Sequence, residues 1–293
     1  MDPILIIGAG IVGLTLGQAL KQVPPLNPDP IPVLTEAENI PFVILERDPS
    51  PNFRGQGWAI TLHWALPYMQ QLLPETILSA IQSTQVDPET ALNDNGNFLF
   101  LNLATGEPKC KIPPSLRWRV NREKMRGVLL DGIEESICWG NRVVGVDAGA
   151  GEDGVSVILH DGRQVKGKMV VGVEGSRSIV RQMLRPDAYR NTVLPVRFTG
   201  VSVELTSEEI VPLRTMDPLL FQGCQPDTGV FFWFSVLEIP RVHGGRYRAQ
   251  ICMSWLVKGL QLDMRSRRIK YEYYVGIYLS SPQSCTEHIS LAT

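Results

Sequence analysis

The chain opens with a short apolar run that is followed at once by closely spaced glycines. Residues 3–7 are long enough for one buried strand, and residues 14–21 have the composition of a helix. Between them, the spacing G-x-G-x-x-G is made by Gly8, Gly10 and Gly13. The first glycine permits a tight turn, the second lets a ligand approach the backbone, and the third lets helix and strand pack closely. This order predicts a site for the diphosphate of a dinucleotide.

A second short apolar run ends on an acidic residue, which is the usual partner of such a glycine loop. Residues 42–45 predict a buried strand, and Glu46 follows them directly. A carboxylate here accepts hydrogen bonds from ribose hydroxyls and repels a 2′-phosphate, so it favours FAD or NAD over NADP. The acid usually lies about 20 residues after the glycines. Five prolines in residues 24–32 explain its later position, since they predict an exposed loop over residues 23–41.

The hydrophobic pattern changes along the rest of the chain. Up to residue 190, short strands and helices are mixed, and the pattern predicts elements over 98–101, 109–112, 121–133, 142–147, 155–159, 168–172 and 177–184, of which 121–133 and 177–184 are helices. From residue 193 the runs become long, β-branched and aromatic, and they predict strands over 196–205, 230–237 and 247–256. We therefore expect an α/β fold with a Rossmann-like domain over 1–190, an inserted β-rich region over 191–257 and an unpatterned tail over 258–293.

Composition narrows the class of protein. The 293 residues carry a net charge of −2, with 44% hydrophobic and 20% charged residues, as in ordinary globular proteins, and no basic excess points to nucleic acid. The five cysteines form no C-x-x-C pair, so we expect neither a disulfide framework nor a zinc site. Cysteines without disulfides are typical of a reducing compartment, so we expect a cytoplasmic protein. The four histidines lack ligand spacing, so no metal is expected. Residues 3–20 carry no charge, but their glycines favour nucleotide binding over a membrane span.

Three separated segments, taken together, resemble one family. They are the glycine loop with Glu46, residues 119–125 with the sequence RVNREKM, and residues 168–181 with the sequence KMVVGVEGSRSIVR. In this order they resemble the fungal FAD-dependent monooxygenases, single-component flavoproteins that are similar to aromatic hydroxylases. Residues 54–62 also look like that family's stretch after the ribose acid, and the likeness covers residues 1–257. The resemblance implies an FAD-binding domain over 1–190 and a substrate region over 191–257.

The resemblance also implies which residues bind the cofactor. The glycine loop would hold the diphosphate of FAD, Glu46 its adenosine ribose, and Arg122 its phosphates or ribityl chain. The third segment matches the motif Asp-Gly-x-x-Ser-x-x-Arg, although Glu174 replaces the aspartate. The complete set of expected cofactor-binding residues is Gly8, Gly10, Gly13, Glu46, Arg54, Gly57, Ile60, Arg119, Arg122, Glu174 and Gly175.

The arginines and the third segment also have a simpler structural alternative. Arg119 and Arg122 could form surface salt bridges, and Arg54 could lie on a loop surface. The third segment could be a strand–turn–helix corner that Ser176 caps. No catalytic residue can be named from the sequence.

The implied function is FAD-dependent oxidation. The resemblance implies an oxidoreductase that uses NAD(P)H and O2 to hydroxylate a small organic substrate, with an aromatic compound as one candidate. One feature departs from the family, because no Gly-Asp dipeptide occurs, whereas the family carries a later Gly-Asp-Ala-Ala-His-type segment. We therefore expect a truncated member. Two alternatives stay open, namely a catalytically inactive FAD- or nucleotide-binding remnant and an NAD-linked dehydrogenase, for which no catalytic His, Lys or Tyr constellation is found.

Overall fold

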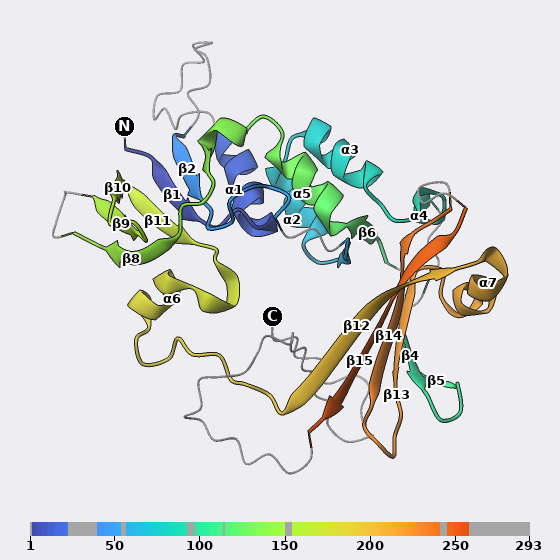
Figure 1. The fold of residues 1–293 in the computed structure, drawn as a ribbon. Coiled ribbons are helices and arrows are strands. Elements are labelled where there is room, and N and C mark those ends of the chain that lie inside the picture. Colours follow the sequence, from blue (N-terminus) through green and yellow to red (C-terminus); the bar gives the residue numbers. More distant parts are fainter. Residues whose placement is uncertain are drawn as a thin grey trace. The chain divides into compact units, whose positions relative to one another are not determined.

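The computed structural model describes residues 2–22, 40–53, 57–92, 96, 98–113, 115–149, 154–240 and 245–257. The chain divides into two compact units, whose elements are labelled in Figure 1. The first unit comprises Met1–Thr84 and Val120–Asn191, and the second comprises Gln85–Arg119 and Thr192–Thr293. Arg54, the proline-rich stretch 24–32 and the expected tail 258–293 lie outside the described residues.

A parallel sheet forms the centre of the first unit. Its strands, in spatial order, are β11 (Met169–Gly172), β1 (Ile4–Ile7), β2 (Phe42–Leu45) and β7 (Ile137–Cys138), and every pairing is parallel. Helix α1 (Ile11–Gln22) follows β1 through the glycine turn. The strands and the helix expected from residues 3–21 and 42–45 are therefore confirmed.

The sequence of these strands explains their central position. Leu5, Ile6 and Ile44 are fully buried, as expected for strands whose two faces are both covered. Because such strands need no polar face, they appear in the sequence as unbroken apolar runs.

The remaining elements of the first unit surround this sheet. The unit also contains a three-stranded antiparallel sheet in the order β10-β9-β8 and the strand pair β3-β6. Strand β6 begins in the second unit and ends in the first. The strands are β3 (Ala59–Leu62), β6 (Trp118–Asn121), β8 (Val143–Asp147), β9 (Val155–Leu159) and β10 (Gln164–Gly167). The helices are α2 (Leu66–Leu72), α3 (Glu75–Ser83), α5 (Arg122–Leu130), α6 (Ile179–Leu184) and the short 3₁₀ turns η1 (Glu134–Ser136) and η3 (Gly175–Arg177).

Helix α5 begins where the sequence predicted and ends earlier. The side chain of Asn121 caps it by accepting hydrogen bonds from the backbone N–H groups of Glu123 and Lys124, both at 3.0 Å. The expected helix ran to residue 133, but α5 ends at Leu130, and Gly132 has a φ of +73°. That left-handed conformation is incompatible with a continuing helix.

The second unit is built on a six-stranded sheet. Its order is β12-β15-β14-β13-β4-β5, and all pairings are antiparallel except that of β13 with β4. The strands are β4 (Phe98–Asn102), β5 (Pro108–Ile112), β12 (Val196–Leu205), β13 (Leu220–Cys224), β14 (Phe231–Glu238) and β15 (Tyr247–Leu256). The helices are α4 (Pro88–Leu92) and α7 (Ser207–Met216). One face of the sheet carries a core in which Phe221, Phe234 and Val236 pack with Ile210 of α7.

The observed unit boundaries differ from the expected domains in one respect. Residues 85–119 belong to the second unit, whereas they were expected in the FAD-binding domain over 1–190. The reason is that β4 pairs in parallel with β13, with Leu99 opposite Phe221. Parallel neighbours require a long connection, and nothing in the local pattern of either strand indicates the partner. The expected α/β class is confirmed by the mixture of helices and sheets.

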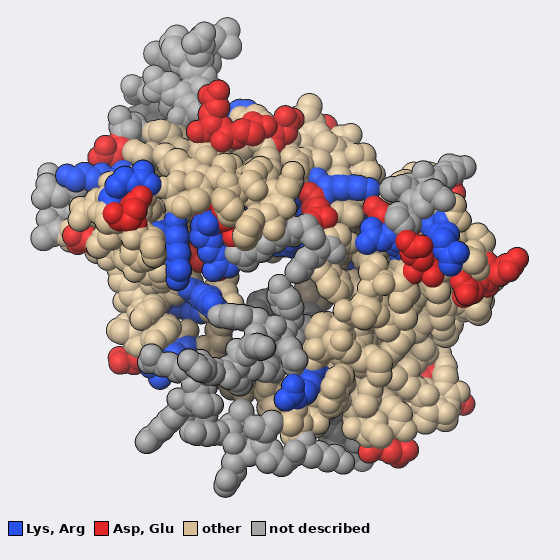
Figure 2. All heavy atoms as spheres, in the orientation of Figure 1, with Lys and Arg blue, Asp and Glu red and all other residues tan. Residues whose placement is uncertain are grey.

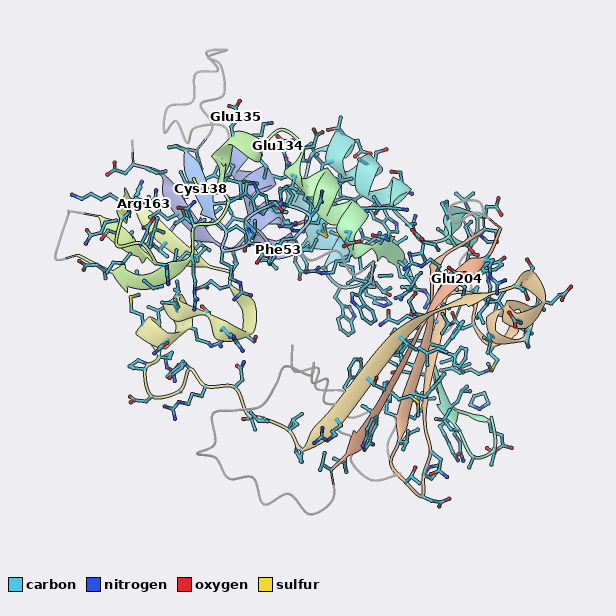
Figure 3. The ribbon with its side chains drawn as sticks, in the orientation of Figure 1. Phe53, Glu134, Glu135, Cys138, Arg163 and Glu204 are labelled. Carbon is cyan, nitrogen blue, oxygen red and sulfur yellow. The ribbon has the colours of Figure 1, made fainter. Side chains whose placement is uncertain are left out.

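Three further observations concern the described part of the chain. None of its helices is both long and apolar enough to cross a lipid bilayer. Within the same residues, no group of His, Cys, Asp and Glu side chains is arranged to hold a metal ion. Cys138, which lies in β7 (Figure 3), is a free thiol, as are Cys224 and Cys252.

Candidate functional site

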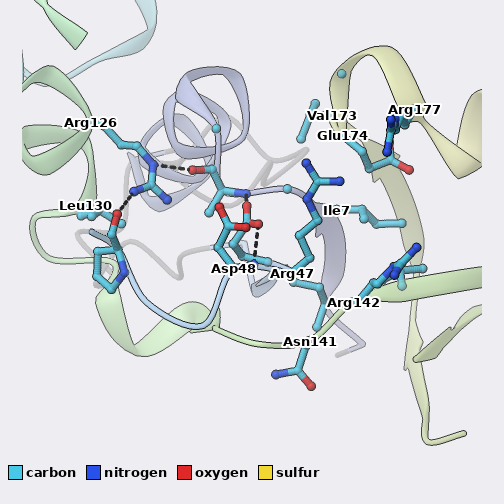
Figure 4. Close-up of a pocket in the computed structure, with 18 of the residues that line it drawn as sticks. Ile7, Arg47, Asp48, Arg126, Leu130, Asn141, Arg142, Val173, Glu174 and Arg177 are labelled. Carbon is cyan, nitrogen blue, oxygen red and sulfur yellow. Dashed lines mark hydrogen bonds between the residues drawn. The ribbon is translucent and has the colours of Figure 1, made fainter. Parts of the chain in front are cut away.

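A pocket of about 750 Å³ lies within the first unit, at the carboxyl ends of its parallel strands. Gly8 follows β1, Glu46 follows β2 and Val173 follows β11, and all three line the pocket (Figure 4). The crevice outside the carboxyl ends of parallel strands is where such sheets bind ligands. The volume is in the range of small-molecule and cofactor sites.

The three glycines of the loop meet different surroundings. Gly8 has a φ of +113°, and a Cβ there would lie 3.0 Å from the carbonyl oxygen of Val173. A Cβ on Gly13 would lie 2.0 Å from the carbonyl oxygen of Gly8, so α1 can pack against the loop only without one. A Cβ on Gly10 would meet nothing within 4 Å, and Gly10 lines the pocket. Open space therefore lies in front of Gly10, at the amino-terminal end of α1, whose first N–H groups have no partner within the helix.

The carboxylate of Glu46 is held in place by the backbone. Its Oε2 accepts a hydrogen bond from the N–H of Ala9 at 2.7 Å, and its Oε1 accepts one from the N–H of Asp48 at 2.9 Å. The residue is 9% exposed. Each carboxylate oxygen has two lone pairs, so both retain acceptor capacity toward the hydroxyl groups of a ligand.

Two arginines of α5 line the pocket one helical turn apart. The guanidinium of Arg122 is exposed and makes no hydrogen bond or ion pair with any part of the chain that the structure describes. Arg126 donates from Nε to the carbonyl oxygen of Ala9 at 3.0 Å and from Nη1 to that of Pro51, and it lies 5.3 Å from the ring centre of Trp139. Arg126 is not among the cofactor-binding residues expected from the sequence. Its i, i+4 spacing from Arg122 was the available signal, since residues four apart lie on one helix face.

The pocket is lined by nearly equal numbers of basic and acidic side chains, but the two kinds differ in how many already have hydrogen-bond partners in the protein. Five arginines (Arg47, Arg122, Arg126, Arg142 and Arg177) face four acids (Glu46, Asp48, Glu123 and Glu174). Figure 4 shows Arg142 and Arg177 on the side of Glu174, with Arg126 on the opposite side. Lys and Arg side chains also gather near α6 and β8 on the face drawn in Figure 2.

The acids are largely committed to backbone N–H groups. Glu123 accepts from the N–H of Gly57 at 3.0 Å, in addition to the bonds to Glu46. The guanidinium groups of Arg47 and Arg142 have no partner among the described residues. The charged groups of the pocket that have no partner among the described residues are therefore positive, and they can bind an anionic ligand.

Glu174 caps a helix. Its Oε1 accepts from the N–H groups of Ile179 at 2.9 Å and Val180 at 3.3 Å, and its Oε2 accepts from the hydroxyl of Ser178 at 2.7 Å. The alternative in which Ser176 caps this corner is wrong in its capping residue, because the hydroxyl of Ser178 accepts from the N–H of Arg181 at 3.0 Å. The helix accordingly begins at Ile179 rather than at residue 177.

The chain has relatives among known proteins. No family model matches the chain. A probable FAD-dependent monooxygenase of Arthroderma benhamiae is 39% identical over 264 residues, which cover 86% of this chain. The FAD-dependent monooxygenase dbaB of Emericella nidulans is 38% identical over 266 residues, which cover 87% of this chain. Over these residues the chain is a homologue of fungal FAD-dependent monooxygenases. It spans 57% and 63% of the lengths of these two relatives.

Solved structures support the same fold. A putative FAD-containing monooxygenase from Photorhabdus luminescens matches with a TM-score of 0.67 at 17% identity, covering 90% of this chain and 65% of that one. The 2,6-dihydroxypyridine-3-hydroxylase from Arthrobacter nicotinovorans matches with a TM-score of 0.60 at 18% identity, covering 89% of this chain and 57% of that one. At these identities the likeness concerns the fold.

The structure brings together six of the residues expected from the monooxygenase resemblance. The residues that line the pocket are Gly8, Gly10, Glu46, Arg122, Glu174 and Gly175. Gly13 lies beneath the loop, where it permits close packing. Gly57 donates its N–H to Glu123, Ile60 is half-buried in β3, and neither lines the pocket.

Arg119 lies in the second unit and outside the pocket. Its Nε donates to the carbonyl oxygen of Val236 at 3.1 Å, and its Nη2 donates to the hydroxyl of Ser235 at 2.7 Å. The residue is 2% exposed, so the alternative of a surface salt bridge is wrong. Burial, and then the neighbouring charge of Arg117, lower the pKa of Arg119 to about 9.

We expect alanine substitution of Arg119 to lower mainly stability, and that of Arg122, three residues later, to lower mainly FAD affinity. Arg119→Ala removes the donor to a buried carbonyl and leaves a cavity, so the second unit should lose about 3 kcal/mol of unfolding free energy. Arg122→Ala removes an exposed side chain, so stability should change by less than about 0.5 kcal/mol while FAD affinity falls about tenfold. Urea unfolding and FAD titration of both variants measure this. A stable Arg119→Ala protein with weakened FAD binding would contradict the assignment.

Proposed function

We propose that the first unit is a Rossmann-like FAD-binding unit, and that it serves the FAD-dependent monooxygenation of a small organic substrate with NAD(P)H and O2. The homology to proteins of that name supports the cofactor and the reaction class. The observation that carries the proposal is the paired engagement of Glu46 by Ala9 and Asp48 beside the open space at Gly10. This combination fits the two parts of an ADP group, its ribose and its diphosphate.

The residues present fit the ADP half of FAD. Gly10 and the amino-terminal end of α1 would hold the diphosphate, because no protein atom fills the space in front of Gly10. Arg122, whose guanidinium lacks a protein partner among the described residues, would neutralise phosphate charge. Glu46 would accept the ribose hydroxyls, and its fixed orientation means that little side-chain entropy is lost on binding.

The chain's own residues would bind and orient the cofactor. Bound FAD supplies the redox chemistry, with NAD(P)H as the reductant and O2 as the source of the added oxygen atom. Arg126 fixes the glycine loop through the carbonyl of Ala9, so the N–H groups of the loop are oriented before the ligand arrives. Glu174 fixes the turn at Gly175 by capping α6.

The experiment that tests this function is a titration of the 293-residue chain with FAD, in which binding is measured by the quenching of flavin fluorescence. We expect Glu46→Ala to weaken binding by about 100-fold, because two charge-assisted hydrogen bonds to ribose, about 3 kcal/mol together, are lost. Glu46→Gln should weaken it by about tenfold, since the amide keeps one acceptor oxygen. Glu135→Ala is the matched control, because Glu135 is exposed on η1 (Figure 3).

Two outcomes decide the proposal. Unchanged affinity in Glu46→Ala, or no quenching with the wild-type chain, would refute the ADP-binding assignment. Circular dichroism of the variants checks that the loss is not unfolding. NADH and NADPH oxidation by the FAD-loaded chain then tests the oxidoreductase part of the proposal independently.

A further inference from the structure

The two faces of the six-stranded sheet in the second unit differ in chemistry. One face carries the core with α7. On the other face, Gln222 of β13 lies directly between Phe100 of β4 and Trp233 of β14 in the strand register. Side chains directly opposite on paired strands share a face and touch. Other side chains on this face include Phe98, Leu220, Cys224, Ser235, Gln250 and Cys252.

Gln222 is a buried amide without a protein partner. The residue is 8% exposed, and its side chain makes no hydrogen bond with any residue that the structure describes. Its amide atoms are not fully sealed from solvent. Buried polar side chains are hydrogen-bonded in the large majority of cases, and an unpaired one reduces stability. The amide of Gln222 therefore keeps its donors and its acceptor available for a ligand that reaches the centre of the sheet.

The aromatic ring beside this amide is held rigidly. The Nε1 of Trp233 donates to the hydroxyl of Ser235 at 3.0 Å, and the same hydroxyl accepts from Arg119 at 2.7 Å. Phe98 meets the indole edge-on, with ring centres 6.2 Å apart and planes at 63°. A fixed aromatic surface favours stacking or edge contact with a flat ligand, because no rotamer freedom is lost on binding.

We propose that Gln222 is a specificity-determining residue, whose amide binds the hydroxyl or carbonyl oxygen of a planar ligand that packs against Trp233 and Phe100. The amide carries both donors and an acceptor, so it can bind either kind of oxygen. A site with an unpaired polar group discriminates against the analogue that lacks the oxygen, because the group then stays unpaired. That this ligand is the substrate rests on the proposed function.

The unpaired amide of Gln222 should lower the stability of the second unit while it strengthens ligand binding. Gln222→Met keeps the length of the side chain and removes the unpaired amide, so the second unit should become more stable. Gln250→Met is the matched control on the same face, since the amide of Gln250 already donates to Sγ of Cys252 at 3.0 Å. That variant should gain no stability.

The test compares two probes, 2-naphthol and naphthalene, by equilibrium dialysis against the 293-residue chain without FAD. We expect the wild type to prefer 2-naphthol by about tenfold, and Gln222→Met to lose that preference through weaker 2-naphthol binding. Gln250→Met should keep it. In thermal unfolding, Gln222→Met should raise Tm by about 2–4 °C.

Several results overturn the inference. They are a lowered Tm of Gln222→Met, a preference that survives in this variant, and a wild-type chain that binds neither probe or both equally. The two proposals remain separable because the dialysis contains no FAD. Failure of the FAD titration leaves the result for Gln222 standing, and failure of the probe comparison leaves FAD binding standing.

Discussion

Gly10→Leu is expected to weaken FAD binding by at least about 100-fold while the chain stays folded. A Cβ at Gly10 meets no protein atom within 4 Å, so the protein itself tolerates a side chain there. The leucine would fill the space in front of the first turn of α1, where the diphosphate would bind, and it would keep the phosphates away from the N–H groups. Because a leucine is a poorer residue than glycine at a helix start, we expect a stability loss of about 1 kcal/mol.

The control at this position is Gly10→Ala, which adds only the Cβ. It should weaken FAD binding much less than leucine does, and a graded series would show that the effect is steric. FAD titration and thermal unfolding of the apo proteins measure the two quantities. If Gly10→Leu binds FAD as the wild type does, the diphosphate does not bind at the glycine loop.

Gly13→Ala is expected to have the larger effect on stability. The added Cβ would lie 2.0 Å from the carbonyl oxygen of Gly8, and a backbone oxygen cannot move aside as a flexible side chain can. Helix α1 would have to shift away from the loop and from β1. We expect a loss of about 3 kcal/mol or more in unfolding free energy, with a matching fall in Tm.

Gly127→Ala is the matched control, because Gly127 also lies within a helix, α5, and a Cβ there would meet nothing within 4 Å. Alanine should stabilise that helix by about 0.5–1 kcal/mol. Opposite signs for the two glycine-to-alanine changes in chemical unfolding would establish close packing at Gly13. A Gly13→Ala protein as stable as the wild type would disprove it.

The elements that could be predicted from the sequence are those whose local pattern decides their structure. The strands at Ile4–Ile7 and Phe42–Leu45 are unbroken apolar runs, and the α5 start is marked by the cap Asn121. Helix α7 was missed because Pro212 lies inside it. A signal was nevertheless present, since Thr206 and Glu209 form a capping box.

Tertiary pairing could not be predicted in the same way. Strand β13 (Leu220–Cys224) contains a glutamine and a glycine, so its alternation is weak, and its parallel partner β4 lies more than one hundred residues earlier. A sequence pattern reports the faces of one element and does not report which element covers them. The assignment of residues 85–119 to the wrong domain follows from this limit.

The residues of the candidate site also differ in whether the sequence could predict them. Gly8, Gly10 and Glu46 were found because a recurring spacing ties them to one local geometry. The contacts of Arg119 and the presence of Arg126 in the site were not foreseen, because they depend on what lies opposite each side chain. Arg119 points to β14 of the second unit, whereas Arg126 reaches the carbonyl of Ala9, which lies far away in sequence.

The pairing of β1 with both β2 and β11 constrains how the protein is made. Strand β1 is translated before both of its neighbours in the sheet, and one of them, Met169–Gly172, is translated much later. Until then the nascent chain exposes an apolar strand with an open edge, which is a template for aggregation. Slow translation between these strands, or a fragment that ends before β11, would therefore make the protein depend on chaperones.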